Sequence, residues 1–146
     1  MSHGDEDARD DRAAAADIAV DRPITAAQLG DVFHRSGIRR PADDLERLQR
    51  MLDHANLVAT AWQGERLVGV ARCFADYAWV CYLSDLAVDR ALQGRGVGRA
   101  LIGAVRAAVG PSSQLVLLAA PGVEGYYEAA GFERATRAFI VKRASG

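Results

Sequence analysis

The sequence predicts an α+β fold in three layers, in which helices cover both faces of a mixed, mostly antiparallel sheet. Segments in which apolar and polar residues alternate indicate antiparallel strands, and segments with apolar residues three and four positions apart indicate helices. The uninterrupted apolar run at residues 115–120 indicates a strand that is buried on both faces and therefore paired in parallel. The predicted order of elements is β-α-α-β-β-β-α-β-α-β-β.

The first predicted strand and helix are bounded by residues with clear local preferences. Alternation at residues 18–20 indicates a short strand, which Pro23 ends. Thr25 and Gln28 have the spacing of a capping box, so we expect a helix to begin there. Gly37 ends this helix.

A second helix and three strands are predicted next. Residues 42–55 place apolar side chains at helical spacing and two acids in the first turn, where the helix dipole favours them. Residues 57–62 and 67–74, joined by a glycine-containing turn, predict an antiparallel hairpin. A further strand is predicted at residues 79–88, where alternation puts Asp85 on the same face as Leu83.

The last third of the chain completes the predicted sheet. An amphipathic helix is expected at residues 97–108, followed by the apolar strand at 115–120. A short helix at residues 123–130 is predicted to end at a glycine. Residues 132–134 and 138–143 are predicted to be the last two strands.

Composition limits the organisation of the chain and the classes of function. Half of the 146 residues are apolar, enough for one domain, which we expect at residues 17–146. Residues 1–16 carry five acids and two arginines and show no apolar periodicity, so we expect a disordered acidic tail. A net charge of -1 argues against a nucleic-acid partner.

Apolar runs and cysteine spacing bear on the location of the protein and on metal binding. No apolar run approaches the roughly 20 residues of a membrane helix, so we expect a cytoplasmic protein with no membrane partner. Cys73 and Cys81 lack metal-ligand spacing, so no metal site is predicted. The abundance of arginine and alanine suggests a bacterial source.

A glycine turn lies between the strand at 79–88 and the following helix. Gly94, Gly96 and Gly98 remove the Cβ atoms that would keep a diphosphate away from the backbone, and Arg95 and Arg99 add positive charge. The first N–H groups of a helix have no partners and lie at the positive end of its dipole. The turn therefore predicts an anion site.

Two common phosphate-binding motifs do not fit this turn. A dinucleotide fold needs its third glycine one position later than Gly98, where Arg99 stands, and more sheet than the remaining residues supply. A P-loop needs Gly-Lys-Ser/Thr, and the only lysine is Lys142. A turn that merely connects strand to helix remains the plain alternative.

The sequence resembles the GNAT (GCN5-related) N-acetyltransferases in two motifs. The run Gln93-Gly94-Arg95-Gly96-Val97-Gly98 is similar to the family's acetyl-CoA signature, and Leu86-Ala87-Val88 is similar to the strand that leads into it. Tyr126-Tyr127-Glu128-Ala129-Ala130-Gly131-Phe132 resembles the family's downstream aromatic-Tyr-Glu-x-x-Gly-Phe segment. The resemblance covers about residues 18–143.

The resemblance implies a GNAT fold in which two parallel strands splay apart around the pantetheine arm of acetyl-CoA. The pantetheine would pair with the backbone of Leu86, Ala87 and Val88, and the diphosphate would lie on N–H groups at the turn. The implied cofactor-binding residues also include Gln93, Gly94, Arg95, Gly96, Val97, Gly98, Arg99, Ala100 and Tyr126.

The implied reaction moves acetyl from acetyl-CoA to a primary amine of a small molecule or peptide by direct attack in a ternary complex. It requires a neutral amine, a stabilised oxyanion and a proton for the thiolate. Tyr127 resembles the family's general acid, and Tyr126 competes for that role. A non-catalytic acyl-CoA-binding sensor or regulatory subunit is the alternative function.

The general base and the acceptor pocket are less defined. Asp85 is the first candidate base, because burial in the cleft would raise its pKa. It is equally a structural carboxylate paired with Arg72. His34 is a second candidate base, and the resemblance also implies that the proton can leave through ordered water, as in some members of the family. The expected acceptor pocket contains His34, Arg39, Phe74 and Tyr82, with Arg39 also readable as part of a solvated turn. Monomer and homodimer both remain open.

Overall fold

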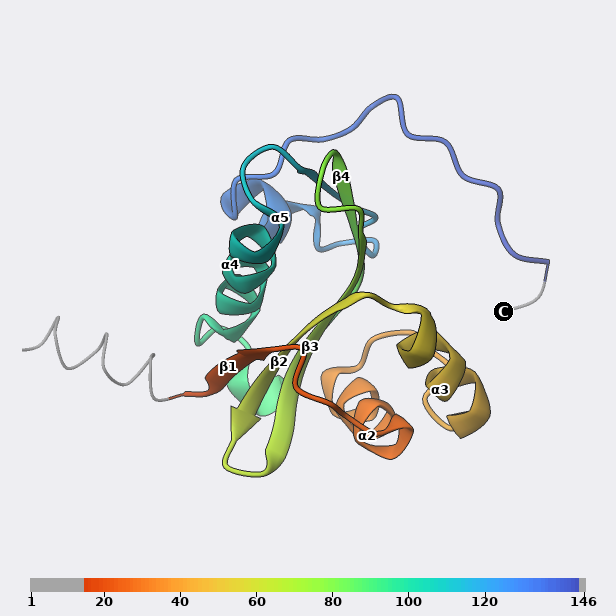
Figure 1. Ribbon diagram of the computed structural model, residues 1–146, viewed down its shortest axis with the longest axis vertical. Coiled ribbons are helices and arrows are strands. Elements are labelled where there is room, and N and C mark those ends of the chain that lie inside the picture. Colours follow the sequence, from red (N-terminus) through yellow and green to blue (C-terminus); the bar gives the residue numbers. More distant parts are fainter. Residues whose placement is uncertain (1–14, 145–146) are drawn as a thin grey trace, which may run out of the picture.

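The computed structural model describes residues 15–144 and confirms the predicted fold class: a mixed sheet with helices on both faces (Figure 1). The sheet has five strands in the order β1-β2-β3-β4-β5, of which only β4 and β5 pair in parallel. The elements are β1 (Asp17–Val20), α2 (Ala26–Ser36), α3 (Leu45–His54), β2 (Leu57–Gln63), β3 (Arg66–Ala75), β4 (Val80–Val88), the 3-10 helix η1 (Arg90–Leu92), α4 (Val97–Val109), β5 (Gln114–Leu117) and α5 (Glu124–Ala129).

Two apolar cores lie on the two faces of this sheet. On one face, α4 packs against the strands through Val97, Leu101 and Val105. On the other face, Leu29 and Phe33 of α2 and Leu48 of α3 form the second core. Figure 1 shows α4 and the α2–α3 pair on opposite sides of the strands. The sheet is therefore covered on both faces, as the three-layer prediction requires.

The start of the first helix is confirmed at the level of its hydrogen bonds. The Gln28 N–H donates to Thr25 Oγ1 over 3.1 Å, and the Thr25 N–H donates to Gln28 Oε1 over 2.8 Å. Gly37 ends α2 with a φ of 80°. The second helix begins at Leu45, three residues later than expected, because the Asp44 side chain accepts from the Arg47 N–H and so forms its N-cap.

One extra residue in β4 changes which side chains share a face. Arg72 is opposite Asp85 and Cys73 is opposite Leu83, so Ser84 is a β-bulge. Leu83 therefore packs in the α4 core, whereas Asp85 pairs with Arg72, which contacts α3. The prediction that Leu83 and Asp85 share a face was wrong, because simple alternation assumes a strand without a bulge.

The last two predicted strands are not formed. Residues 132–134 and 138–143 have no strand pairing in the part of the chain described. A strand exists only with a neighbour, and the apolar pattern of these residues does not reveal where that neighbour lies. The strand predicted at 115–120 is correct in direction, but β5 is only partly buried and forms one edge of the sheet.

Ordered packing begins slightly before the expected domain boundary. Ala15 is buried, and its carbonyl oxygen accepts a 2.9 Å hydrogen bond from the Gln63 side chain. Residues 1–14 of the expected acidic tail lie outside the described residues. Within residues 15–144, no helix is long and apolar enough to cross a membrane.

Two glycines in helices give a matched test of the packing between α2 and the loop that follows it. A Cβ at Gly30 would lie 2.5 Å from the Ala42 carbonyl oxygen, whereas a Cβ at Gly103 meets nothing within 4 Å. We expect Gly30→Ala to lower the free energy of unfolding by about 1–3 kcal/mol, since the backbone must move. Gly103→Ala should raise it by up to about 1 kcal/mol. Urea unfolding followed by tryptophan fluorescence measures both, and equal stabilities would contradict the packing described.

Candidate active site

The parallel strands β4 and β5 separate at the bulge. Their pairing covers Val80–Leu83 of β4 and Gln114–Leu117 of β5, whereas β4 continues to Val88. The backbone of residues 84–88 therefore has no strand partner on the side of β5. Of the N–H and C=O groups that point away from β3, the Ser84 and Val88 carbonyl oxygens accept from Arg40 and Gln93, and the others are free to pair with an extended polar ligand.

The turn after β4 leaves the N-terminus of α4 open. Gly96 is its N-cap residue, with a φ of 85°, and no side chain caps the first turn. Cβ atoms at Gly94 and Gly96 would meet nothing within 4 Å. Because α4 has 13 residues and no acid in its first turn, its free N–H groups present an unneutralised positive end.

Neighbouring polar groups hold this turn in place. The Gln93 side chain donates to the Val88 carbonyl oxygen over 3.0 Å and to the Ser36 carbonyl oxygen over 3.4 Å. Asp89 accepts from the Ala91 N–H and from Arg35 of α2. The Ala91 N–H lowers the pKa of Asp89, with Arg35 adding to the effect. Gln93 thus supports the turn as expected, while Arg95 and Arg99 are exposed beside it.

Gly98 makes room for Tyr126. A Cβ on Gly98 would lie 2.4 Å from the Tyr126 Oη and 3.8 Å from a methyl carbon of Val88. The Tyr126 hydroxyl therefore lies against the first turn of α4, beside the end of β4. The end of β4, the glycine turn and Tyr126 of α5, where predicted cofactor residues lie, are thus next to one another.

The two adjacent tyrosines of α5 have different surroundings. Their rings meet edge to face at 5.2 Å, and Tyr127 also meets Phe132 at 5.6 Å. Burial raises the pKa of both hydroxyls. The nearby charge that opposes this shift is Arg99 for Tyr126 and Arg40 for Tyr127. Tyr126 lies against Gly98 of the glycine turn, whereas Tyr127 packs against the α4-side core.

Asp85 lies at the centre of a buried ion-pair cluster. It is 1% exposed, and its two carboxylate oxygens accept from Arg40 Nε and Arg72 Nε. Arg40 also donates to the Ser84 carbonyl oxygen over 2.9 Å, and Arg72 donates to the Ser84 hydroxyl over 3.0 Å. Of the two roles that the sequence left open for Asp85, these contacts favour the structural carboxylate.

The structural role of Arg40 was not predicted from the sequence, in which Arg39 and Arg40 were interpreted either as groups that recognise a substrate carboxylate or phosphate or as a solvated turn. Arg40 instead reaches from the α2–α3 connection to the bulge of β4. Arg39 is exposed, in keeping with a solvated turn. The only signal in the sequence was the acid on β4, since a buried carboxylate needs hydrogen-bond donors for both of its oxygens.

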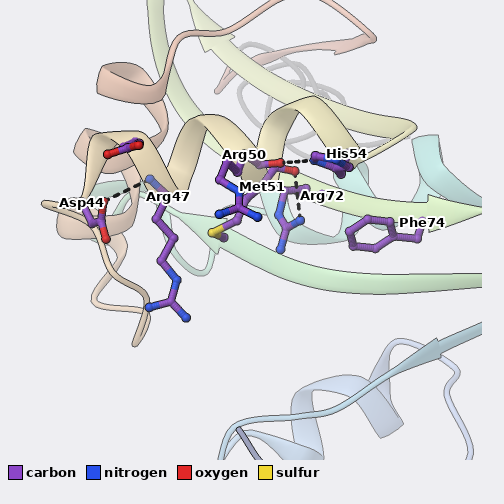
Figure 2. A pocket seen from close by; sticks show the side chains of 8 residues that line it. Asp44, Arg47, Arg50, Met51, His54, Arg72 and Phe74 are labelled. Atoms are coloured by element: carbon purple, nitrogen blue, oxygen red, sulfur yellow. Dashed lines mark hydrogen bonds between the residues drawn. The ribbon is translucent and has the colours of Figure 1, made fainter. Parts of the chain in front are cut away.

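The four residues expected to form an acceptor pocket are not all together. Phe74 and Tyr82 are opposite each other on β3 and β4. His34 instead pairs with Asp43 over 2.8 Å, both exposed. Phe74 contributes to a groove of about 790 Å³ between α3 and β3 (Figure 2). The groove is lined by Asp44, Glu46, Arg47, Arg50, Met51, His54, Arg72 and Phe74.

The arrangement of sheet, bulge and uncapped glycine turn is that of an acetyltransferase. Residues 31–144 match the GNAT acetyltransferase domain, so the chain belongs to that family. This confirms the resemblance first seen in the glycine turn and in the Tyr126–Phe132 segment. Among the described residues, no group of three or more histidines, cysteines or acids is placed to hold a metal ion.

Curated relatives match most of this chain but only part of their own length. Serotonin N-acetyltransferase 2, chloroplastic, from Oryza sativa subsp. japonica is 33% identical over 132 residues, covering 84% of this chain and 65% of that protein. A ycf52-like N-acetyltransferase, uncharacterized, from Prochlorococcus marinus is 32% identical over 64% of this chain and 54% of its own length. The chain thus spans just over half to just under two thirds of these relatives.

Solved structures show the same fold at lower identity. A GNAT family acetyltransferase from Streptococcus pneumoniae TIGR4 has a TM-score of 0.67 and 21% identity, covering 88% of this chain and 98% of that chain. The aminoglycoside N-acetyltransferase AAC(6')-Iy in complex with CoA has a TM-score of 0.65 and 17% identity, covering 88% and 96%. At these identities the likeness concerns the fold.

Replacing the buried acid tests the structural role of the cluster. Asp85→Asn leaves Arg40 and Arg72 without a negative partner, so we expect the free energy of unfolding to fall by about 3–5 kcal/mol. Asp43→Asn removes the pair of His34 and Asp43, whose side chains are 57% and 92% exposed. It should change the free energy of unfolding by less than about 1 kcal/mol. Urea unfolding of both variants measures the difference, and a negligible effect at Asp85 would refute this role.

Proposed function

We propose that this protein transfers an acetyl group from acetyl-CoA to a primary amine of a small molecule or peptide, by direct attack of the amine in a ternary complex. The observation that carries the proposal is the uncapped N-terminus of α4, which lies beside the free backbone edge of β4. The first feature suits a diphosphate, and the second suits the amides of a pantetheine arm. Membership of the GNAT family supports the same ligand.

The residues present fit acetyl-CoA on stereochemical grounds. Gly94 and Gly96 adopt positive φ and leave open the space that side chains would occupy. Arg95 and Arg99 are exposed next to that space and supply positive charge for phosphate. The Tyr126 hydroxyl occupies the space next to Gly98, at the first turn of α4.

Stabilisation of the oxyanion is assigned to the backbone of β4. The N–H groups of residues 84–88 that point away from β3 lie past the point where β5 separates. Backbone donors of this kind act without reorganisation, because the strand already holds them. Arg40 and Arg72 fix the bulge from the opposite side through Asp85 and Ser84.

Tyr127 is the proposed proton donor to the leaving sulfur. Tyr126 lies against Gly98 at the glycine turn, which suits it to the phosphate end of the cofactor. Tyr127 is the adjacent, partly buried tyrosine beside Phe132, at the position that resembles the family's general acid. Both oxygens of Asp85 are occupied by guanidinium groups, so we assign Asp85 to positioning and the deprotonation of the amine to solvent.

The groove beside α3 is the proposed acceptor site. Phe74 lies in it with 39% of its surface exposed, and Tyr82 is opposite Phe74 on β4. The exposed Phe74 ring suits an amine with an aromatic body, and the rice relative is named for such a substrate, serotonin. Arylalkylamines are therefore the first acceptors to test.

Two glycines with positive φ test the anion cradle. Gly96 has φ +85° and Gly64 has φ +60°, and a Cβ at either meets nothing within 4 Å. Alanine at each position brings a similar backbone penalty of about 1–2 kcal/mol. Only Gly96→Ala puts a methyl group where the diphosphate would lie, so we expect it to weaken CoA binding at least about tenfold. Isothermal titration with CoA measures both, and equal affinities would argue against the cradle.

The role of Tyr127 is tested by release of free thiol from acetyl-CoA with a panel of arylalkylamines. We expect Tyr127→Phe to lower kcat by about 10²–10⁴-fold, with a small change in the KM for acetyl-CoA. Tyr126→Phe is the matched control and should retain most of kcat. Since burial raises the pKa of Tyr127, its hydroxyl stays protonated at neutral pH, and kcat should not fall with rising pH below about pH 10.

Two outcomes of this assay would overturn the assignment. Tight CoA binding without thiol release from any amine would indicate an acyl-CoA sensor or regulatory subunit. Equal losses in the two phenylalanine variants would show that Tyr127 has no special part in proton transfer.

A further inference from the structure

The groove between α3 and β3 has an aromatic end and a basic wall. Phe74 is 39% exposed, and the Arg72 Cζ lies 5.3 Å from the centre of its ring. Arg47 and Arg50 line the groove from α3, and both are exposed. Figure 2 shows these two side chains projecting from the same side of the helix, with Phe74 beyond Arg72. The groove thus offers an aromatic surface and two cations to one ligand.

Helical spacing makes the two arginines of α3 neighbours. Positions three apart lie on the same face of a helix, with a rise of about 4.5 Å between them. Two guanidinium groups so placed can bind a single carboxylate, which has an oxygen for each of them. The interior of this protein contains such an arrangement, since the Asp85 carboxylate accepts from both Arg40 and Arg72. Arg47 and Arg50 form an exposed pair of the same kind on the groove wall.

The two guanidinium groups of this pair have no partner among residues 15–144. The Arg47 N–H donates to Asp44, and the Arg50 carbonyl oxygen is 2.9 Å from His54 Nδ1, so both contacts engage only the backbone of the arginines. Asp44 and Glu46 also line the groove, but they lie at the start of α3, and Asp44 is used as its N-cap. The guanidinium groups are therefore free to bind an anion.

The middle of the groove leads to the bulge of β4. Arg72 lines the groove and donates to the Ser84 hydroxyl over 3.0 Å and to the Met51 carbonyl oxygen over 3.3 Å. Ser84 begins the part of β4 that has no partner on the side of β5. In Figure 2, Arg72 lies between Arg50 and Phe74. A ligand that reaches the bulge from this groove therefore has the aromatic ring on one side and the arginine pair on the other.

We propose that the acceptor is an aromatic amine that also carries a carboxylate, as an aromatic amino acid does, and that Arg47 and Arg50 bind this carboxylate. The ring of the acceptor lies against Phe74, and its amine lies near Ser84. A second ammonium group in place of the carboxylate would be repelled, so polyamines are poor acceptors. The role of the ligand as acceptor rests on the proposed acetyl transfer, whereas its binding is measurable without turnover.

Binding of the expected products tests the groove first. The N-acetyl derivatives of phenylalanine, tyrosine and tryptophan carry the carboxylate, and the corresponding amides have nearly the same shape without the charge. Isothermal titration should show about tenfold tighter binding of the acids. Arg47→Gln and Arg50→Gln should each reduce this preference, and the double variant should abolish it. Arg106→Gln, which changes an exposed arginine on α4, should preserve it.

Thiol release from acetyl-CoA then tests whether the bound molecule is the acceptor. The amines of amino-acid amides are less basic than those of the acids, so the ratio of kcat/KM between acid and amide is compared among variants. This ratio should fall about tenfold in Arg50→Gln and keep its parent value in Arg106→Gln. Added sodium chloride should narrow it, because salt screens exposed charges.

The results separate this proposal from the proposed acetyl transfer. Equal binding of acids and amides, no binding of any derivative, or a preference that survives in the double variant would overturn the carboxylate site. Faster acetylation of spermidine than of every aromatic amino acid would also overturn it. Charge-dependent binding of the N-acetyl products, without thiol release from any amine, would confirm the carboxylate site and contradict the acetyl transfer instead.

Discussion

The site depends on one buried negative charge. Asp85 lies in the interior with two guanidinium groups on its oxygens, and an uncompensated carboxylate there would be strongly unfavourable. The need to neutralise it draws Arg40 inward from the α2–α3 connection and holds Arg72 on β3. Both arginines then also bind Ser84, so that the same cluster fixes the bulge at which β4 and β5 separate. The cluster therefore stabilises both the position of the α2–α3 connection and the conformation of β4 at the bulge.

The glycine turn carries free backbone donors at the start of α4 and two exposed arginines, Arg95 and Arg99. Gln93 holds this turn against two elements, since its side chain donates to the end of β4 and to the end of α2. Gly98 matters for a packing reason, because its missing Cβ gives Tyr126 its place.

Features that depend on neighbouring residues in the chain were predicted well from the sequence. Features that depend on contacts between distant residues were predicted less well. Thr25, Gln28 and Gly37 act on neighbours in the chain, so the bounds of α2 followed from the sequence. The three glycines after β4 likewise predicted the turn and its open helix end. The bulge at Ser84 was not foreseeable, since it arises from the register between β3 and β4. The same holds for Arg40, whose carboxylate partner is 45 residues away in sequence, and for residues 138–143, whose pattern predicts a strand without specifying its neighbour.

The bulge at Ser84 is not required for the packing of the two cores. Leu83 and Asp85 reach opposite cores with Ser84 between them, and a strand without Ser84 would deliver them to the same two cores by ordinary alternation. The extra residue is therefore dispensable for the apolar layers. A bulge bends its strand, and this one lies where the parallel ladder of β4 and β5 stops. The β4 backbone after Leu83 is therefore both irregularly paired with β3 at the bulge and unpaired on the side of β5.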